Sequence, residues 1–457
     1  MVKKSLKEKR HEARNYSIKE GVFATVRTSF GDYYIAPFAI AINTSSSLVA
    51  MLSSISGLLG PTTQLFSSKL LGKYTRKQII TRAMLFESLM WLPLIAIAFL
   101  FYRGILVNSL PFLLLLSFGI YVILMNATSP AWFSWMWDIV DKKKRGRFFS
   151  KRNLILGFVA VVLAILASFF LDYTATRNWT MFGFMILFGL ALIARLISRS
   201  LIKKQYEPKL KVEKSSYFYF WQFVKKAPET NFGKFSIYRL FLTLTNTIST
   251  SLLAVYLLRN LSLKYSTYII IILAGSVFSF VVMELLGKFA DRYGNYEVIR
   301  ISSILMPFLP ILWILHPSPI YLVLVPAAVS GIAWAGYHLS EINFIYDNVS
   351  QQKRGVAVSY YNMFSGIGMF IGAGIGALLI KYLKVDFILP IFAIFILGAI
   401  LRLFVVVIGL RKIREIKHTM KFKGIASIHD IVSKEAKPTV YDEFHEITHI
   451  GKYLKVK

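Results

Sequence analysis

The feature that most constrains the fold is a series of long apolar segments that fills most of the chain. A helix needs roughly 20 mainly apolar residues to cross a bilayer, and 56% of the 457 residues are hydrophobic. A longer polar segment separates the sixth apolar segment from the seventh. The sequence therefore predicts an all-α polytopic membrane protein with twelve transmembrane helices, six in each half, and argues against a soluble protein. The predicted spans lie near 21–43, 46–71, 78–101, 109–137, 148–172, 179–203, 235–258, 265–287, 297–315, 319–346, 356–380 and 387–411.

The basic residues are distributed unevenly between the two sides of these spans. The chain has a net charge of +31, which on a soluble protein would suggest a nucleic-acid partner. About 45 of the 54 Lys and Arg residues, however, fall on the side that holds the N-terminus, as the positive-inside rule describes. We therefore expect a multi-pass protein of the cell membrane with both termini cytoplasmic. Its excess charge would face anionic lipid headgroups rather than nucleic acid.

The chain contains no cysteine, which excludes disulfides, thiol catalysis and cysteine-based metal sites. It also has no Gly-x-x-x-x-Gly-Lys-Ser/Thr loop for a nucleotide. We expect no cofactor and no bound metal. Any process driven by ATP would require a separate subunit.

An internal repeat relates the two halves. The segment from Asp138 to Arg145 and the segment from Asp347 to Arg354 share the pattern Asp-x-Val-x-x-x-Lys-Arg, followed by Gly. An apolar segment precedes and follows each copy, so each copy is predicted to be a tight turn between two membrane helices. Because each half has an even number of spans, the halves should be pseudo-symmetric about an axis along the membrane normal.

The apolar segments also predict the division of the chain. The aromatic and basic residues around 217–226 indicate a helix lying in the membrane interface. The predicted parts are a cytoplasmic N-terminal segment (1–20), a six-helix bundle (21–204), a cytoplasmic linker with an interfacial helix (205–232), a second six-helix bundle (233–412) and a cytoplasmic tail (413–457).

A short motif occupies the turn between the eighth and ninth spans. Gly287, Asp291, Arg292 and Gly294 form the pattern Gly-x-x-x-Asp-Arg-x-Gly, which closely resembles the signature loop of the major facilitator superfamily. The resemblance covers 20–412 and implies two six-helix bundles and secondary transport. The first half's copy, 68–77, keeps basic residues but departs from the pattern, with Gly72 in place of Asp and Thr75 in place of the second Gly.

This turn is a candidate cytoplasmic gate. Its glycines allow close helix contact and a positive-φ turn. Asp291 can lie against the N-terminus of the eleventh span, where the helix dipole favours an anion. With Arg292, Asp347 and Arg354 it would form a charge cluster that breaks when the conformation changes, and Asp138 and Arg145 would have the same role in the first half. The alternative is that these charges are solvated and only determine topology. The gating candidates are Gly287, Asp291, Arg292, Gly294, Asp138, Arg145, Asp347 and Arg354.

Ionisable residues inside spans are costly and usually face a partner or a water-filled cavity. The resemblance implies that the first and fourth helices of each half line a central cavity, and these helices carry Arg27, Asp32, Arg239, His338 and Glu341. We expect Asp32 and Glu341 to exchange protons, because burial and nearby cations shift carboxylate protonation in opposite directions. Arg27, Arg239 and His338 would contact the substrate or pair with these carboxylates.

The competing interpretation is that the buried charges hold helices together. Arg27 would then pair with Asp32 or Glu87. We expect Glu87, Glu284, Arg195 and Arg402 to be structural, since they lie on peripheral spans or near a cytoplasmic end.

Together these features favour a secondary active transporter, not an enzyme. It would move a small organic solute by alternating access, coupled to protons, and act as a monomer in the lipid bilayer. One alternative is a non-transport protein of the same fold, with a lipid-moving or signalling role through the tail. The other is a membrane-embedded lipid-modifying enzyme, for which the sequence lacks an Asp-rich metal motif.

Overall fold

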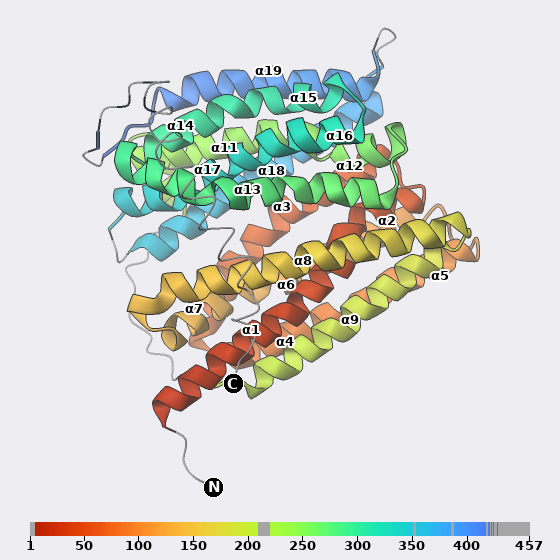
Figure 1. Cartoon of the computed structure of the whole chain (residues 1–457), viewed down its shortest axis with the longest axis horizontal. Coiled ribbons are helices and arrows are strands. Elements are labelled where there is room, and N and C mark those ends of the chain that lie inside the picture. Colours follow the sequence, from red (N-terminus) through yellow and green to blue (C-terminus); the bar gives the residue numbers. More distant parts are fainter. Residues whose placement is uncertain are drawn as a thin grey trace. The chain divides into compact units, whose positions relative to one another are not determined.

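A computed structural model describes residues 5–208, 220–350, 353–384 and 388–416, together with residues 419, 420, 422, 424 and 427 of the tail. Over these residues the chain is helical and contains no strand (Figure 1). Eleven of the described helical segments are long and apolar enough to cross a membrane. The first predicted span is divided into α1 (Leu6–Phe30), η1 (Asp32–Tyr34) and α2 (Ile35–Ala41).

The remaining helices follow the predicted spans closely. Those of the first half are α3 (Ser46–Ser68), η2 (Lys69–Gly72), α4 (Arg76–Leu89), α5 (Trp91–Tyr102), α6 (Leu110–Ala127), α7 (Ser129–Ile139), η3 (Lys142–Lys144), α8 (Arg145–Thr176) and α9 (Thr180–Lys204). Those that follow are α10 (Phe220–Lys226), α11 (Asn231–Thr250), α12 (Leu253–Val255), η4 (Tyr256–Asn260), α13 (Tyr265–Tyr293), α14 (Asn295–Leu305), η5 (Met306–Phe308), α15 (Leu309–Leu315), α16 (Pro319–Leu322), η6 (Val323–Ala327), α17 (Ala328–Asn348), α18 (Arg354–Tyr382) and α19 (Pro390–Leu410).

Local sequence explains where these helices start and bend. Ser5 before α1 and Thr75 before α4 each form a capping box with the residue three positions later, which satisfies free backbone N–H groups. Proline interrupts the ninth and tenth spans at η5 and η6, because it lacks an N–H and clashes with the preceding turn.

The chain forms two compact units. The first comprises 1–214, 251–269 and 373–382, and the second comprises 215–250, 270–372 and 383–457. Each unit thus takes most of its residues from one half of the sequence. The boundaries predicted from the apolar segments, 21–204 and 233–412, remain predictions.

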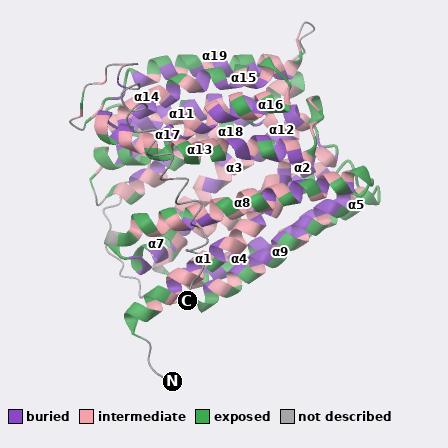
Figure 2. Cartoon of the chain, in the orientation of Figure 1, coloured by how far each residue is buried: buried purple, intermediate pink, exposed green. Residues whose placement is uncertain are grey.

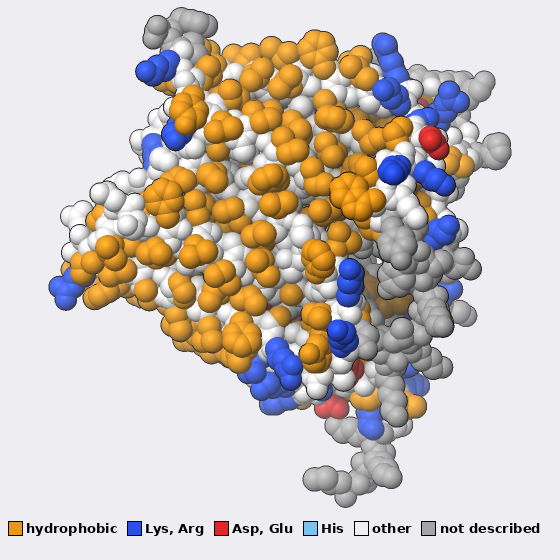
Figure 3. Space-filling view, turned by 180° about the vertical axis from the view of Figure 1, so that it is seen from behind, with side chains coloured by type: hydrophobic (Ala, Val, Ile, Leu, Met, Phe, Trp, Pro, Cys, Tyr) orange, Lys and Arg blue, Asp and Glu red, His pale blue; other side chains and the backbone are white. Residues whose placement is uncertain are grey.

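The outward-facing side chains are those of a protein in lipid. Many large apolar residues are exposed, among them Phe112, Leu116 and Phe404, each at least 60% accessible. Figure 2 shows buried and exposed residues alternating along the helices, and in Figure 3 apolar side chains cover most of the visible face. In water an apolar surface of this extent would drive association, whereas in a bilayer it meets lipid.

Small residues allow the closest helix contacts in the second unit. The backbones of α13 and α17 meet at Gly275 and Gly331, where an added Cβ on Gly331 would overlap the Gly275 carbonyl. Gly368 and Gly372 of α18 lie in the same way against the backbone of α11. Such pairs let helices approach in lipid, where packing replaces the hydrophobic effect.

The last helix of the second unit, α19, buries an arginine without a carboxylate partner among the described residues. Arg402 is fully buried and donates to the Met306 carbonyl at 2.8 Å. That carbonyl lacks the N–H of an α-helical bond, because the residue four positions later is Pro310, and it accepts the Leu309 N–H instead. The second Nη of Arg402 lies 3.3 Å from the Asn246 carbonyl. Arg402 is therefore bound by backbone acceptors of α11 and the broken ninth span, as its expected structural role requires.

The short helix α10 lies in the predicted linker. Its Phe223 is buried and packs against Tyr360 of α18 at a ring distance of 5.5 Å, whereas Trp221 is 73% exposed. The aromatic residues 217–219 lie outside the described residues. An exposed tryptophan beside basic residues fits the membrane interface, and this placement of α10 stays a prediction.

Candidate functional site

The first unit buries an arginine near the end of α1. The guanidinium of Arg27 lies 3.1 Å from Asp32 Oδ2 and 2.9 Å from Glu87 Oε1, and it also donates to the hydroxyl of Tyr121. Tyr121 donates in turn to Asp32 Oδ1. Arg27 is 8% exposed and Glu87 is fully buried, so each charge depends on its partners. We call these four residues the Arg27 centre.

A helix break brings the centre together. α1 ends at Phe30, and Gly31 lies against the ring of Trp91, where any Cβ would overlap it. The chain then enters the short turn η1, so the carboxylate of Asp32 returns toward Arg27. Glu87 comes from α4 and Tyr121 from α6, so three separate spans supply the partners.

Further charges extend the Arg27 centre toward the start of α1. Glu87 also accepts from Arg195 of α9 at 2.5 Å, and Arg195 lies 4.0 Å from Glu20. Glu20 in turn lies 3.5 Å from Arg152 of α8. The series alternates three carboxylates with three guanidinium groups, so its formal charges cancel. Because these pairs connect α1, α4, α8 and α9, the series can hold the helices of the first unit together. This is the structural role that we expected for Glu87 and Arg195.

This series borders a cavity of about 230 Å³ within the first unit. Its charged lining residues are Glu20, Arg152 and Arg195, and the guanidinium of Arg152 lies 4.7 Å from the ring centre of Trp132. A polar cavity of this size has room for several water molecules.

The second unit has its own buried arginine, at the repeat position in α11. Arg239 Nη1 lies 3.5 Å from Glu341 Oε2 of α17, and its Nε donates to Ser365 of α18. Glu341 accepts from the Tyr361 hydroxyl at 2.8 Å and shares a 2.8 Å hydrogen bond with His338 Nδ1. We call Arg239, His338, Glu341 and Tyr361 the Arg239 centre.

Aromatic rings surround this second arginine. Its guanidinium lies 5.1 Å from the ring centre of Tyr337, 5.6 Å from that of Trp334 and 5.8 Å from that of Tyr361. His338 stacks on Trp334 with ring centres 5.2 Å apart, and half of its side chain is exposed. His338 thus gives this centre an accessible edge, while Arg239 and Glu341 are each 12% exposed.

The structure groups the five predicted intramembrane residues by unit: Arg27 with Asp32, and Arg239 with His338 and Glu341. Sequence reasoning missed Tyr121 and Tyr361, whose hydroxyls join the charges in each centre. Nothing in the sequence distinguishes them from the other tyrosines, of which the chain has 24. Only their contacts identify them.

The signature turn lies between α13 and α14. Gly294 has φ of +96°, a conformation that favours glycine, whereas Gly287 lies within α13 with space around it. Asp291 is exposed and forms no hydrogen bond or ion pair with any residue that the structure describes. The Arg292 guanidinium lies 5.6 Å from the ring centre of Tyr293. The predicted contact of Asp291 with the start of α18 stays a prediction.

The two copies of the Asp–Arg turn have the same geometry, and in neither does the structure place the aspartate against the arginine. Arg145 donates to the Trp137 carbonyl at 2.8 Å and Arg354 to the Tyr346 carbonyl at 2.9 Å. In both copies the arginine thus folds back onto the helix that precedes the turn.

Each aspartate instead contacts the first residue of the third membrane span of its own half. Asp138 pairs with Arg76 of α4 at 2.5 Å, and Asp347 accepts from Asn295 of α14 at 3.0 Å. The repeat seen in the sequence is therefore a repeat of contacts as well.

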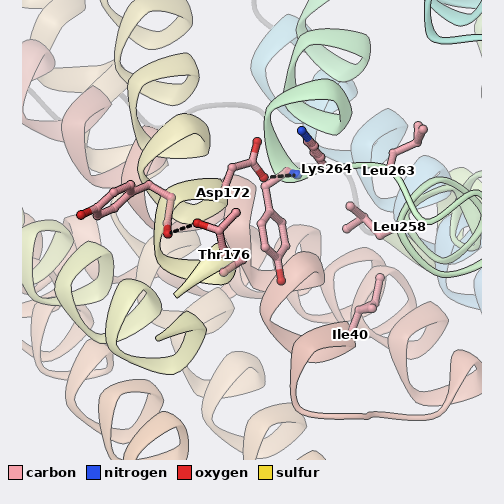
Figure 4. Close-up of a pocket in the computed structure, with 9 residues that line it drawn as sticks. Ile40, Asp172, Thr176, Leu258, Leu263 and Lys264 are labelled. Atoms are coloured by element: carbon pink, nitrogen blue, oxygen red, sulfur yellow. Dashed lines mark hydrogen bonds between the residues drawn. The ribbon is translucent and has the colours of Figure 1, made fainter. Parts of the chain in front are cut away.

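A pocket of about 490 Å³ lies elsewhere in the first unit, between the end of α8 and the start of α13 (Figure 4). Asp172 accepts from the backbone N–H groups of Tyr265 and Ser266 at 2.8 and 3.1 Å, and so caps α13. The pocket is lined by Ile40, Asp172, Tyr173, Ala175, Thr176, Leu258, Leu263, Lys264 and Tyr265. Because its only carboxylate caps a helix, we give this pocket a structural role.

Each arginine centre combines a buried cation, a carboxylate and a tyrosine hydroxyl. Such a group can bind a polar ligand by exchanging a hydrogen bond, and it can take up a proton when the carboxylate loses its partner. Over the described residues, no three His, Asp or Glu side chains are placed to hold a metal ion.

Comparison with known proteins places this geometry in context. A sequence model described as Major Facilitator Superfamily matches residues 22–283 and 235–436. A structure of a variant of the nucleoside transporter NupG has a TM-score of 0.68 at 13% identity, covering 89% of this chain and 100% of that chain. A bacterial homologue of the iron transporter ferroportin, in an inward-facing state, has a TM-score of 0.65 at 15% identity. The match covers 89% of this chain and 100% of that chain.

A bacterial homologue of the human lysosomal transporter Spinster covers 95% of this chain and 98% of its own, with a TM-score of 0.57 at 14% identity. A sequence search of curated proteins finds no match. At these identities the structural likeness shows the fold and does not identify a solute.

Proposed function

The chain belongs to the Major Facilitator Superfamily, and we propose that it is a secondary active transporter that moves a small organic solute by alternating access, coupled to protons. The observation that carries this proposal is the pair of arginine centres. One lies in each unit, and Arg27 and Arg239 occupy repeat positions on the first helix of their halves.

The proposed coupling follows from how a carboxylate behaves beside a buried cation. Asp32 lies against Arg27, and Glu341 against Arg239. When a conformational change or an arriving solute separates such a pair, the buried carboxylate loses its stabilising charge, and taking up a proton neutralises it. Return of the arginine favours release of that proton. Binding and protonation would thus be linked at the same two residues.

The proposed solute is small, polar or zwitterionic, with an apolar or aromatic part. The Arg239 centre offers a cation, a carboxylate and a half-exposed imidazole beside Trp334. Polar or charged groups of a solute would bind the first two, and a ring would stack on the aromatic residues. Nucleosides are uncharged, but their hydroxyls and base edges can hydrogen-bond to a cation and a carboxylate and their base can stack. The structural likeness to a nucleoside transporter makes them the first compounds to test.

We further propose that the signature turn with Asp291 and Arg292 forms the cytoplasmic gate, helped by the turns at Asp138/Arg145 and Asp347/Arg354. The positive-inside pattern supports a cytoplasmic location for these turns and for both termini. A monomer suffices for this mechanism, because both centres belong to one chain.

The first test is a thermal-unfolding screen of the purified protein in detergent against nucleosides, amino acids and amphiphilic drugs. A ligand that binds only the folded protein at 100 times its Kd raises stability by about 2.7 kcal/mol, and the screen would be run at about pH 5.5 and about pH 7.5. We expect a hit whose stabilisation differs between the two pH values. Equal stabilisation at both would argue against a titrating site.

The second test measures accumulation of the hit in proteoliposomes under an imposed pH gradient. Asp32→Asn and Glu341→Gln should each abolish gradient-driven accumulation while leaving exchange of solute intact. Glu284→Gln is the matched control, because Glu284 is 44% exposed and its ion pair among the described residues is a local one with Lys288. If both centre variants insert, fold and accumulate like the parent protein, proton coupling at these residues is wrong.

A further inference from the structure

The start of the C-terminal tail lies on the signature turn. Glu415 accepts from the backbone N–H of Tyr296 at 2.9 Å, and Tyr296 is the second residue of α14. The backbone N–H of Met420 donates to the Arg292 carbonyl at 3.2 Å. The tail therefore contacts both helices that flank the turn, α13 through Arg292 and α14 through Tyr296.

The same segment is fixed to the start of α11. Asn231 accepts from the Arg414 N–H at 3.0 Å and donates to the Arg414 carbonyl at 2.9 Å. Its amide also donates to Asn348 at the end of α17, at 2.7 Å. Asn231 thus connects the tail with the start of α11 and with the end of α17.

An aromatic anchor completes the contact. The ring of Phe422 lies 5.8 Å from that of Phe289 and 5.9 Å from that of Tyr293, and the Arg300 guanidinium lies 5.4 Å from its centre. Phe289 and Tyr293 belong to a buried cluster with Ala290 and Val298. Phe422 is therefore packed against the apolar core beneath the turn.

Gly294 connects the turn with the tail. Its φ of +96° requires a residue that tolerates this conformation. A Cβ at this position would also lie within 3.2 Å of Thr419 and against the carboxylate of Glu415. The glycine of the signature pattern thus leaves space for the tail as well as shaping the turn.

The first half has a related contact made by the start of the linker. Glu207 Oε1 lies 3.4 Å from the backbone N–H of Lys77, the second residue of α4, and the Pro208 carbonyl accepts from Arg76 at 2.7 Å. In each half, the segment after the last helix thus places a glutamate on the N-terminus of the third span. The aromatic anchor occurs at the second-half turn, on Phe422.

We propose that this segment, the tail strap (residues 413–416, 419, 420 and 422), is an intramolecular restraint on the signature turn. The strap contacts the turn in the conformation of this structure, and these contacts favour it over any conformation in which the turn has moved away from the strap. Release of the strap frees the turn to rearrange. Its importance for transport rests on the proposed function, in which this turn is the gate.

Hydrogen–deuterium exchange of the full-length protein, followed by mass spectrometry, tests the strap without any solute. Glu415→Ala and Phe422→Ala, combined, should speed exchange in peptides covering 289–300 by roughly tenfold, because the strap then keeps only its backbone contact from Met420 and loses the side-chain contacts of Glu415 and Phe422. Each single variant should have a smaller effect, and Phe422→Tyr should restore slow exchange by keeping the ring.

Two controls make the result specific. Lys412→Ala changes an exposed residue just before the strap and should leave exchange unchanged. Peptides covering 68–77, in the first-half turn, should keep their parent rates in every strap variant. Parent-like exchange at 289–300 in the double variant would overturn the proposal, and so would an equal increase at 68–77, because the effect would then be global loosening.

The outcome is separable from that of the proposed function. If Asp291→Asn leaves transport unchanged, the turn is not the gate, whatever the exchange data show. If the strap variants leave exchange unchanged while Asp291→Asn impairs transport, the gate stands and the strap is wrong.

Discussion

The two arginine centres occupy repeat positions but differ in their surroundings. Arg27 lies between two carboxylates, Asp32 and Glu87, and joins a series of paired charges that continues through Arg195. Among the described residues Arg239 has one carboxylate partner, Glu341, and its other neighbours are Ser365 and three aromatic rings. In the first centre two carboxylates pair with the arginine, whereas the second has one carboxylate and a half-exposed histidine at its edge.

This difference shows what the duplication preserved. It kept an arginine on the first helix of each half and a tyrosine within hydrogen-bonding distance of the carboxylate. It did not keep the helix that supplies the carboxylate: Asp32 follows Arg27 on the same span, whereas Glu341 comes from α17. We infer that the Arg27 centre, through Glu87 and Arg195, also holds its unit together, and that the Arg239 centre is the better placed of the two to bind the solute.

The strongest challenge to this comparison is removal of Glu87. Glu87→Gln would leave two buried guanidinium groups, those of Arg27 and Arg195, without the charge that they share. Breaking a buried ion pair from one side typically costs about 3–5 kcal/mol. We expect a loss of that size in the free energy of unfolding, measured by chemical denaturation in detergent. The surface variant Glu284→Gln should change it by less than about 0.5 kcal/mol. Similar losses in both variants would mean that the first centre is not structural.

Removal of Glu341 should have a smaller effect on stability. In Glu341→Gln, Arg239 loses its carboxylate but keeps three aromatic rings and Ser365, and the glutamine can still accept from Tyr361. We expect a loss of about 1–3 kcal/mol in the same denaturation assay. A loss equal to or larger than that of Glu87→Gln would contradict the distinction between an arginine paired with two carboxylates and one paired with a single carboxylate.

The tyrosines provide a finer comparison. Tyr121→Phe removes a hydroxyl that contacts both Arg27 and Asp32, and Tyr361→Phe removes one that donates to Glu341. Each should cost about 1 kcal/mol, with the larger loss at Tyr121 because its hydroxyl serves two charged groups. The two denaturation midpoints measure this directly, and a larger loss at Tyr361 would reverse the inference.

The smallest effect on stability is expected at His338. Its side chain is half exposed, so His338→Ala should change the free energy of unfolding by about 0.5 kcal/mol or less. Binding of the solute hit should nevertheless weaken, because the imidazole both orients Glu341 and stacks on Trp334. Isothermal titration would detect this. Unchanged affinity would place the solute away from the Arg239 centre.

Sequence reasoning predicted a membrane protein of this superfamily with an all-α fold of twelve helices in two bundles. The membrane class, the superfamily and the all-α fold are confirmed. The predicted twelve spans compare with eleven helical segments of membrane-spanning length among the described residues, and the first predicted span is divided after Phe30. Apolar runs identify spans because the bilayer requires continuous apolar length. The repeat of Asp138 and Arg145 at Asp347 and Arg354 identified the duplication. Apolar runs and repeated motifs are each recognised within a short stretch of residues, so a single sequence is enough to show them.

Partners across helices were harder to predict. The sequence indicated that Arg27 could pair with Asp32 or Glu87, and the structure shows both pairs. Glu20 fell in the predicted N-terminal segment, yet it is buried because α1 continues without a break from Leu6. Glu415 lies about 120 residues beyond the turn that it contacts, and no periodicity links such distant positions.

Arg402 has a consequence for the order in which the second half is assembled. A lone arginine near the middle of a helix opposes insertion by about 2.5–3.5 kcal/mol. The acceptors that offset this are carbonyls of α11 and of the proline-broken ninth span, both of which are synthesised earlier. The last helix should therefore settle in the bilayer only after these partners are in place. In the cell, α19 would act as a checkpoint for biogenesis, since its arginine is satisfied only when the helices before it are correctly arranged.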